Sequence, residues 1–120
     1  MPHTMGHEMS IEMKQCIQNC TDCHNICVET LAHCLQIGGK HVEAAHLKSL
    51  LDCVDTCRIS ADFMLRSSDL HPQVCGVCAE ACARCAESCE QFEDDAQMKA
   101  CAEECRRCAE SCREMSKMKM

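Results

Sequence analysis

Blocks of regularly spaced cysteines recur along the chain and constrain its fold more than any other feature. Three blocks share the spacing C-x3-C-x2-C-x3-C, at residues 16–27, 78–89 and 101–112. A fourth block, at residues 53–64, keeps two cysteines and has Ser60 and Met64 in the remaining positions. Steps of four and three residues place the side chains of one block on one face of a helix. The pattern therefore predicts a helix for each block, with its thiols along one face.

Turn-forming stretches separate the four blocks. Gly38-Gly39, residues 67–72 and the stretch "FEDD" at residues 92–95 lie between segments rich in Ala, Glu, Gln, Met, Lys and Arg. Such stretches are typical of helix ends and helix starts. We therefore expect helices at residues 8–37, 41–66, 72–91 and 95–117. Short connections make neighbouring helices antiparallel, which predicts an all-α, up-down-up-down four-helix bundle with a cysteine-lined core.

The composition indicates one domain with a core made largely of sulfur-bearing side chains. The 120 residues include 16 Cys and 9 Met, but 2 Phe and no Trp or Tyr. Buried Cys behaves as a small hydrophobe, so Cys and Met can fill an interior for which other apolar residues are too few. We expect a single domain at residues 8–117, preceded by a flexible Met- and His-rich tail at residues 1–7.

Charge and hydropathy exclude several classes of protein. The net charge of -7 argues against a nucleic-acid partner, and no apolar stretch is long enough to cross a membrane. The N-terminal sequence "MPHTMGHEMS" has no basic region followed by an apolar run. We therefore expect a cytoplasmic protein with reduced thiols rather than a secreted disulfide scaffold. No catalytic constellation is visible, so we do not expect an enzyme.

Sixteen cysteines in register indicate metal binding rather than simple core filling. Cysteines three or four residues apart on one helix bridge poorly as disulfides. Soft thiolates prefer Cu(I), Zn(II) or iron–sulfur clusters. A zinc ion with four thiolates carries a net charge of about -2, which is costly in a dry core. Cu(I) ions bridged by thiolates form a neutral cluster, so the pattern favours Cu(I), at about eight to sixteen ions per chain.

Two other functions are compatible with the cysteine pattern. A thiol redox buffer would have exposed cysteines of low pKa that form cross-helix disulfides quickly. A store for zinc or cadmium would have about four tetrahedral thiolate sites. A di-iron site is excluded, because Glu43 and His46 supply one Glu-x-x-His motif where such bundles need two.

One end of the predicted bundle gathers thioethers and imidazoles. It combines the start of the first and third helices with the end of the second and fourth. The residues concerned are His3, Met5, His7, Met9, Met13, Met64, His71, Met115, Met118 and Met120. Thioether and imidazole groups hold Cu(I) without losing a proton at neutral pH. They therefore predict a port at which copper ions are captured and passed inward.

The other end of the predicted bundle is expected to be an apolar cap. It combines Cys34 and Cys89 with His46, Leu50, Phe92 and Met98. His46 continues the thiol stripe and could be either a ligand or a hydrogen-bonded core histidine. The remaining histidines lie off the stripe and are expected at the surface: His24, His33 and His41.

The first two helices carry a second apolar stripe, away from the thiols. Its members are Ile17, Val28, Leu31, Leu35, Leu47, Leu51, Val54 and Leu65. The third and fourth helices have mostly Ala, Glu and Arg in the equivalent positions. An apolar face outside the core predicts burial against another chain, and thus a homo-oligomer.

From about Met9 onward, the chain resembles the cytosolic copper storage proteins of bacteria, four-helix bundles that hold Cu(I) in a cysteine-lined interior. The resemblance rests on the repeated C-x3-C-x2-C-x3-C pattern. It implies a homotetramer that holds copper safely, with a copper chaperone or a copper enzyme as a candidate partner. Ser60 departs from the pattern and leaves a gap, so the second helix is expected to hold less metal.

The resemblance also implies that every cysteine is a metal ligand. These residues are Cys16, Cys20, Cys23, Cys27, Cys34, Cys53, Cys57, Cys75, Cys78, Cys82, Cys85, Cys89, Cys101, Cys105, Cys108 and Cys112. Their positions at the ends of the bundle make six further residues candidate ligands: Met9, Met13, His46, Met64, Met98 and Met115.

Overall fold

The computed structural model describes residues 9–118, most of which lie in helices. The elements are α1 (Ile11–Ile37), the short 3-10 helix η2 (Gly39–Val42), α2 (Ala44–Leu65), α3 (His71–Glu90) and α4 (Ala96–Ser116). The four expected helices are confirmed, with bounds that differ by at most three residues. The prediction was wrong at residues 41–43, which belong to η2 and to the residue preceding α2.

Side-chain caps and a pair of glycines set several helix ends. Ser10 and Asp95 precede α1 and α4, and each side chain accepts hydrogen bonds from backbone N–H groups of the first turn. Gly38 and Gly39 follow α1 with φ values of 76° and 57°. This left-handed conformation costs glycine little, and it turns the chain so that η2 packs against both α1 and α2.

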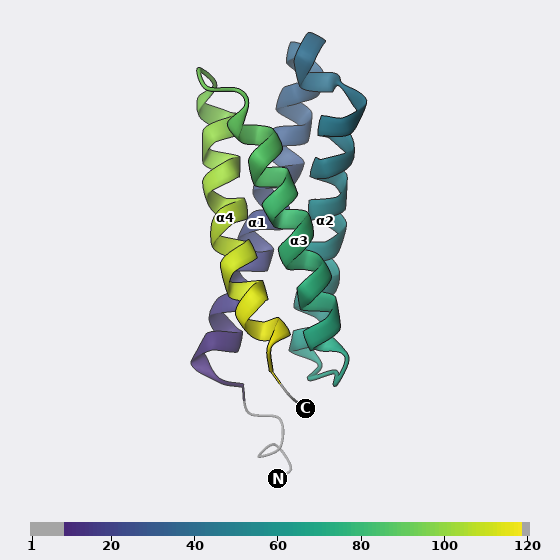
Figure 1. Cartoon of the computed structure of the whole chain (residues 1–120), viewed down its shortest axis with the longest axis vertical. Helices are drawn as coiled ribbons and strands as arrows, with labels where there is room; N and C mark the ends of the chain where they lie inside the picture. Colours follow the sequence, from purple (N-terminus) through teal and green to yellow (C-terminus); the bar gives the residue numbers. More distant parts are fainter. Residues whose placement is uncertain (1–8, 119–120) are drawn as a thin grey trace.

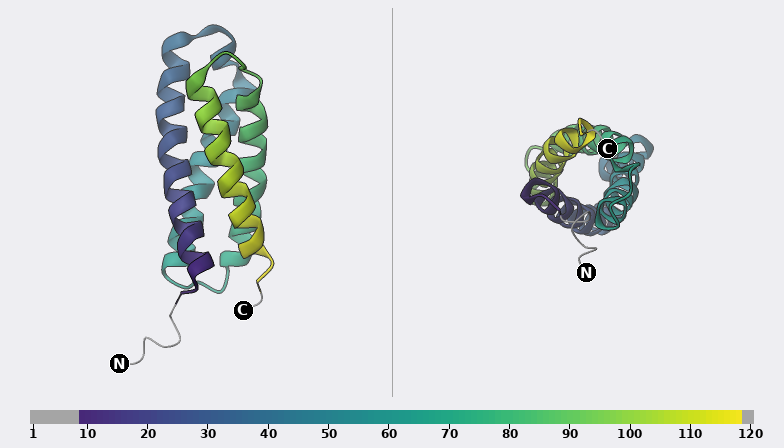
Figure 2. Two further views of the ribbon diagram at one scale, coloured as in Figure 1. Left: turned by 90° about the vertical axis from the view of Figure 1, so that its left-hand side faces the viewer. Right: turned by 90° about the horizontal axis from the view of Figure 1, so that it is seen from below.

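The four long helices run antiparallel around a common axis (Figure 1). Each one contacts its two neighbours, and among the described residues the diagonal pairs α1–α3 and α2–α4 make no backbone contact. Seen along its axis, the bundle is therefore a ring of helices (Figure 2). Its principal extents are 54 × 22 × 19 Å, so the four inward faces enclose one long, narrow core.

Sulfur fills this core, as the composition predicts. All the cysteines have no exposed surface, and the largest apolar side chains that share this burial are Leu50, Met64 and Met98. Buried alanines lie beside the cysteines of α3 and α4: Ala79, Ala86, Ala102 and Ala109. Their small side chains let the two backbones approach closely, and α3 and α4 make the most extensive contact of any helix pair.

The outer apolar stripe of α1 and α2 is divided between core and surface. Half of its members are partly buried and pack against the core: Ile17, Leu31, Leu47 and Val54. The others are 44–60% exposed: Val28, Leu35, Leu51 and Leu65. Within residues 9–118, none of the helices combines the length and apolar character that crossing a membrane requires.

Candidate metal site

The sixteen cysteines all face the interior of the bundle. Each is a free thiol with no exposed surface. α1 contributes five of them, α2 contributes two, α3 contributes five and α4 contributes four. The inward orientation that the helical spacing predicts is confirmed for every cysteine.

Sulfur atoms touch one another across the axis of the bundle. Cys53 Sγ lies 3.5 Å from both Cys23 Sγ and Cys82 Sγ, which connects α2 to α1 and α3. Cys57 Sγ lies 3.8 Å from Cys108 Sγ and thus connects α2 to α4, the helix diagonally opposite. These are contact distances, well beyond the disulfide bond length of about 2.05 Å. The thiols therefore form a continuous column of sulfur.

The column contains overlapping groups of four thiols. In each group the four Sγ atoms lie within 4.8 Å of one another. Five such groups are Cys20/Cys78/Cys108/Cys112, Cys23/Cys53/Cys57/Cys82, Cys23/Cys27/Cys53/Cys105, Cys27/Cys85/Cys101/Cys105 and Cys57/Cys78/Cys82/Cys108. Cys53 and Cys57 each belong to two of these groups, so their sulfurs would bridge neighbouring ions if adjacent groups were occupied together. The arrangement suits a metal–thiolate cluster better than a series of isolated tetrahedral sites.

Burial opposes the ionisation of these thiols when no metal is present. It is the main cause that raises the pKa of Cys34 to about 11, and the nearby carboxylate of Asp95 adds to the effect. In the middle of the column, hydrogen bonds with Cys101 and Cys23 raise the pKa of Cys105. A dry core cannot hold many thiolates at contact distance unless cations replace the protons. The site is thus built to exchange protons for metal ions.

The gap in the pattern of α2 is filled by a buried hydroxyl group. Ser60 has no exposed surface, and its Oγ donates a hydrogen bond of 3.4 Å to the carbonyl oxygen of Val74. The hydroxyl is therefore satisfied by the backbone of α3. Met64, one turn further along α2, is also fully buried.

We define the Met/His end by Met13, Met64, His71 and Met115. It lies where α1 begins and α4 ends, beside the turn from α2 to α3 (Figures 1 and 2). Met64, His71 and Met115 are buried, whereas Met13 is partly buried against the core. The expected gathering is confirmed for these four residues. Met9 is partly buried and Met118 is 38% exposed, while His3, Met5, His7 and Met120 lie outside the described residues.

His71 has an unusual environment at the Met/His end. The residue is 1% exposed, and its Nδ1 lies 3.0 Å from the carbonyl oxygen of Ser68. Since a carbonyl only accepts, Nδ1 carries the proton and Nε2 keeps a lone pair. Nε2 is buried and has no hydrogen-bond partner among residues 9–118. An imidazole whose other nitrogen donates to a carbonyl is the usual form of a histidine ligand to metal.

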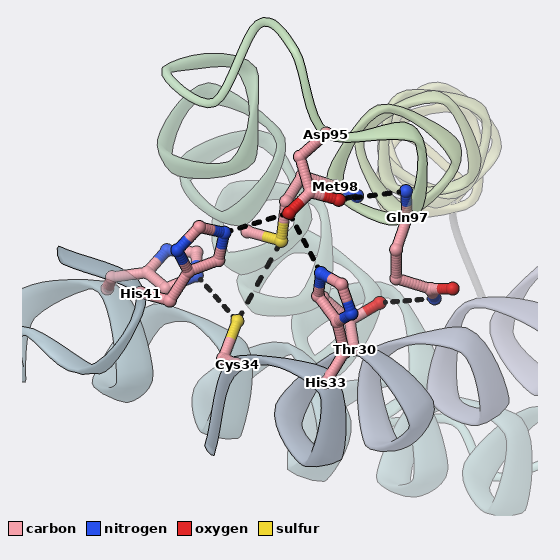
Figure 3. A network of polar contacts seen from close by, with 8 residues as sticks. Thr30, His33, Cys34, His41, Asp95, Gln97 and Met98 are labelled. Carbon is pink, nitrogen blue, oxygen red and sulfur yellow. Dashed lines mark hydrogen bonds and ion pairs between the residues drawn. The ribbon is translucent and has the colours of Figure 1, made fainter. Parts of the chain in front are cut away.

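We define the capped end by Cys34, His46, Phe92 and Met98, at the opposite end of the column. Cys34 Sγ lies 3.4 Å from His46 Nε2 and 3.8 Å from Met98 Sδ (Figure 3). His46 Nδ1 lies 2.7 Å from Ser88 Oγ, and burial lowers the pKa of the ring. Phe92 packs on His46 with ring centroids 5.0 Å apart. His46 is thus hydrogen-bonded through both ring nitrogens, and its partner Cys34 also contacts the thioether of Met98.

The off-stripe histidines lie outside the thiol column, as expected, although each is partly buried and has a hydrogen-bond partner. His24 is partly buried, with Nδ1 3.0 Å from the carbonyl oxygen of Val54. His33 and His41 are partly buried as well, and both contact Asp95. The sequence marked Asp95 only as a residue suited to a helix start. Its proximity to the two histidines depends on the turn after α1, which the helical periodicity does not describe.

The comparisons with known proteins agree with this geometry. The family described as "Copper storage protein" matches residues 9–117, which include all four long helices. No curated protein sequence matches the chain significantly. Among solved structures, the Nmul_A1745 protein from Nitrosospira multiformis is 46% identical with a TM-score of 0.83, covering 88% of this chain and 94% of that chain.

Two further solved structures contain copper. The Cu(I)-bound copper storage protein BsCsp3 is 30% identical with a TM-score of 0.81, covering 88% of this chain and 98% of that chain. The copper storage protein Ccsp from Streptomyces lividans, loaded with 10 copper equivalents, is 27% identical with a TM-score of 0.78, covering 88% of this chain and 83% of that chain.

Proposed function

The chain belongs to the copper storage protein family, and we propose that its sixteen core cysteines are the ligands of the stored copper. The protein stores copper as Cu(I). The single observation that carries the ligand assignment is the column of fully buried sulfurs at contact distance. These sulfurs come from all four helices, and each group of four thiols combines cysteines of at least two helices.

The overlap between the thiol groups supports a polynuclear Cu(I) cluster. Each shared sulfur bridges two ions, and full bridging brings the ratio of copper to thiolate close to one. The cluster then carries little net charge, which a low-dielectric core requires. We expect about eight ions per chain without bridging and about sixteen with complete bridging.

The two alternative functions have less support. Three of the thiol groups share no cysteine and could each hold a separate Zn(II) or Cd(II) ion. Each such ion with four thiolates would leave a net charge of about -2 in the dry core, which is costly. A redox buffer would need exposed thiols of low pKa. The thiols are instead fully buried, and the pKa of Cys34 is raised to about 11.

The Met/His end is the proposed site of copper uptake. Met13, Met64 and Met115 would supply thioethers there, and Met9 a further one at the start of α1. His71, which the sequence placed at this end but which was not among the six further candidate ligands, adds an imidazole whose Nε2 has no partner among the described residues. These groups bind Cu(I) more weakly than thiolates, so an ion captured there is favoured to move inward.

The capped end is proposed as the terminal position of the store. Cys34, His46 and Met98 would supply a thiolate, an imidazole and a thioether to one ion. Ser88 orients the imidazole through its second nitrogen. Phe92 covers His46, which limits loss of copper to solvent at this end.

Several wider properties complete the proposal. Residues 8–117 form the single copper-binding domain, and the tail expected at residues 1–7 lies outside the described residues. The store works in the cytoplasm, where thiols stay reduced, and it exchanges copper with a chaperone or a copper enzyme rather than catalysing a reaction. The exposed apolar residues of α1 and α2, such as Leu35 and Leu65, support assembly into a homo-oligomer, a tetramer by analogy with the family.

An anaerobic titration of the reduced protein with Cu(I), against a competing chelator, tests this function. Retention of about ten or more ions per chain is the expected result. Binding of about four ions or fewer would instead indicate isolated tetrahedral sites and would contradict a shared store. Titration of the same sample with Zn(II) provides the comparison.

A further inference from the structure

A second cluster of ligating side chains lies outside the thiol column. His33 of α1, His41 of η2 and Asp95 before α4 meet beside the capped end (Figure 3). The Nε2 atoms of both histidines lie 2.8 Å from the same atom, Oδ2 of Asp95. The side chains are 30%, 16% and 16% exposed, respectively. The three groups are therefore reachable from solvent without opening the core.

The carboxylate of Asp95 is held in place by the start of α4. Its Oδ1 accepts hydrogen bonds from the backbone N–H groups of Gln97 and Met98, at 3.0 and 3.2 Å. These bonds leave Oδ2 for the two histidines (Figure 3). One oxygen thus fixes the helix start, and the other is presented to the imidazoles.

The two imidazoles are positioned by packing. The ring of His41 lies 4.3 Å from the ring of Phe92 and 5.8 Å from the ring of His33, measured between centroids. The turn at Gly38 and Gly39 brings η2 back against α1, which places His41 near the last turns of that helix. The cluster therefore depends on three separate elements rather than on one flexible segment.

We propose that His33, His41 and Asp95 form a site for a divalent metal ion of borderline softness, of which Zn(II) is the representative. Two imidazoles and one carboxylate are favoured ligands for such ions, with a solvent molecule in the fourth position. Ligand atoms about 2.0–2.1 Å from a tetrahedral ion lie about 3.4 Å apart. Each Nε2–Oδ2 distance would therefore open by about half an ångström to admit the ion. The proton that each Nε2 donates to Oδ2 would move to Nδ1 of the same ring, or be released to solvent, so that Nε2 offers its lone pair.

The donor atoms of His33, His41 and Asp95 differ from the thiols of the core, so the two sites should prefer different ions. The cluster has no sulfur, so Cu(I) prefers the thiol column, whereas a divalent ion finds two nitrogens and an oxygen close to the surface. Copper stored in the core and a divalent ion at this site would not compete. The ion would tie α1, η2 and α4 together at the capped end.

The local charges partly oppose and partly favour a cation. The positive end of the α4 dipole and the ammonium group of Lys40, 5.7 Å from the ring of Phe92, disfavour it. Asp95 supplies the opposing charge. Although burial opposes its ionisation, hydrogen bonds from His33 and His41 hold the pKa of Asp95 at about 2.

The test is a titration of the reduced, Cu(I)-loaded protein with Zn(II), followed by NMR on histidine ring nitrogens. Cu(I) and Zn(II) are both closed-shell ions, so the signals stay observable. We expect the Nε2 signals of His33 and His41 to move together and to saturate at one ion per chain. Because the signals are assigned to individual histidines, the experiment distinguishes this site from other histidines. The signals of His33 and His41 also report Zn(II) binding if the core takes up no copper, so the test does not depend on the proposed store.

Matched variants complete the experiment. D95N keeps an N-cap side chain but loses the carboxylate charge, and His33→Gln removes one imidazole from a partly exposed position. Each should weaken Zn(II) binding at least about tenfold. The control His24→Gln changes another partly buried histidine of α1, which contacts Val54 instead, and should bind as the unmodified protein does. Unchanged signals of His33 and His41 at saturating Zn(II), or unchanged affinity in D95N and His33→Gln, would overturn the proposal.

Discussion

The two ends of the bundle each bury one histidine, but the two rings are bonded differently. His46 at the capped end has partners for both nitrogens, Cys34 Sγ at 3.4 Å and Ser88 Oγ at 2.7 Å. His71 at the Met/His end has a partner for Nδ1 only, and its buried Nε2 has none within the described part of the chain. A buried ring nitrogen without a partner is costly unless a ligand satisfies it.

This difference indicates that the ends have different roles. At the capped end both ring nitrogens of His46 have hydrogen-bond partners, and Phe92 packs over the ring, so no metal is needed to satisfy this histidine. The Met/His end lacks one interaction that a copper ion could supply. Between them lies the column of buried cysteine thiols. The asymmetry therefore implies capture at one end and closure at the other.

The largest expected effect is a difference between the two ends in how Cu(I) affinity depends on pH. The pKa of Cys34 is raised to about 11, so this thiol is protonated at neutral pH and Cu(I) must displace its proton. Affinity for an ion that displaces one proton should rise about a hundredfold between about pH 7 and pH 9. Thioethers of the Met/His end lose no proton, so capture there should not depend on pH in this way.

Chelator competition at several pH values, with proton release followed by an indicator, measures this dependence. Cys34→Met gives the capped end a thioether like those of the other end. The variant should release one proton fewer per loaded chain than the unmodified protein. A Cu(I) affinity that does not change with pH would contradict the exchange of protons for copper.

Stability of the reduced, metal-free protein should distinguish the two histidines. His46→Leu removes the partner of buried Cys34 and Ser88 and should cost about 1–3 kcal/mol. His71→Leu removes the hydrogen bond from Nδ1 to the carbonyl of Ser68, but it also removes a buried Nε2 that has no partner among the described residues. The two effects oppose each other, so the free energy of unfolding should change by less than about 1 kcal/mol. Denaturant unfolding followed by circular dichroism gives both values. Equal losses in the two variants would show that the ends are equivalent.

Uptake kinetics should depend on the Met/His end alone. Met64→Leu combined with Met115→Leu keeps the apolar volume but removes two buried thioethers, and should slow Cu(I) uptake by about tenfold. Met98→Leu is the matched control, because Met98 is as fully buried as Met64 but lies at the capped end. Stopped-flow absorbance of Cu(I)–thiolate formation measures the rates. Slower uptake in Met98→Leu, with no change in the double variant, would reverse the assignment of the two ends.

The smallest expected effect concerns the gap in α2. Ser60→Cys places a thiol at a fully buried position between Cys57 and Met64, which lengthens the column toward the Met/His end. Capacity should increase by about one ion per chain. Ser111→Cys, a partly buried position beside the stripe of α4, is the control and should leave capacity unchanged. The titration described above provides the measurement.

The sequence predicts the fold and the thiol column well because both follow from helical periodicity. Gly38 and Asp95 locate helix ends through backbone conformation and capping, which are local effects. The position of each cysteine on its helix determines that it faces inward. Met64 and Met115 could be assigned to one end because the antiparallel order alone brings their helix termini together.

Contacts that depend on connections between helices could not be predicted in this way. His33 and His41 meet Asp95 because the turn after α1 folds η2 back over that helix. Periodicity describes the faces of helices and carries no information about such a turn. The free Nε2 of His71 likewise depends on the carbonyl of Ser68 in the turn before α3. In both cases the missing information lies in loop geometry.

The most direct test of the account is a crystal structure of the copper-loaded protein with copper positions located by anomalous scattering. The account predicts a row of closely spaced copper ions along the axis, bridged by shared sulfurs such as those of Cys53 and Cys57. It also predicts weaker sites at the Met/His end, with His71 Nε2 as a ligand. Isolated copper ions that share no sulfur, or copper bound mainly outside the core, would contradict it.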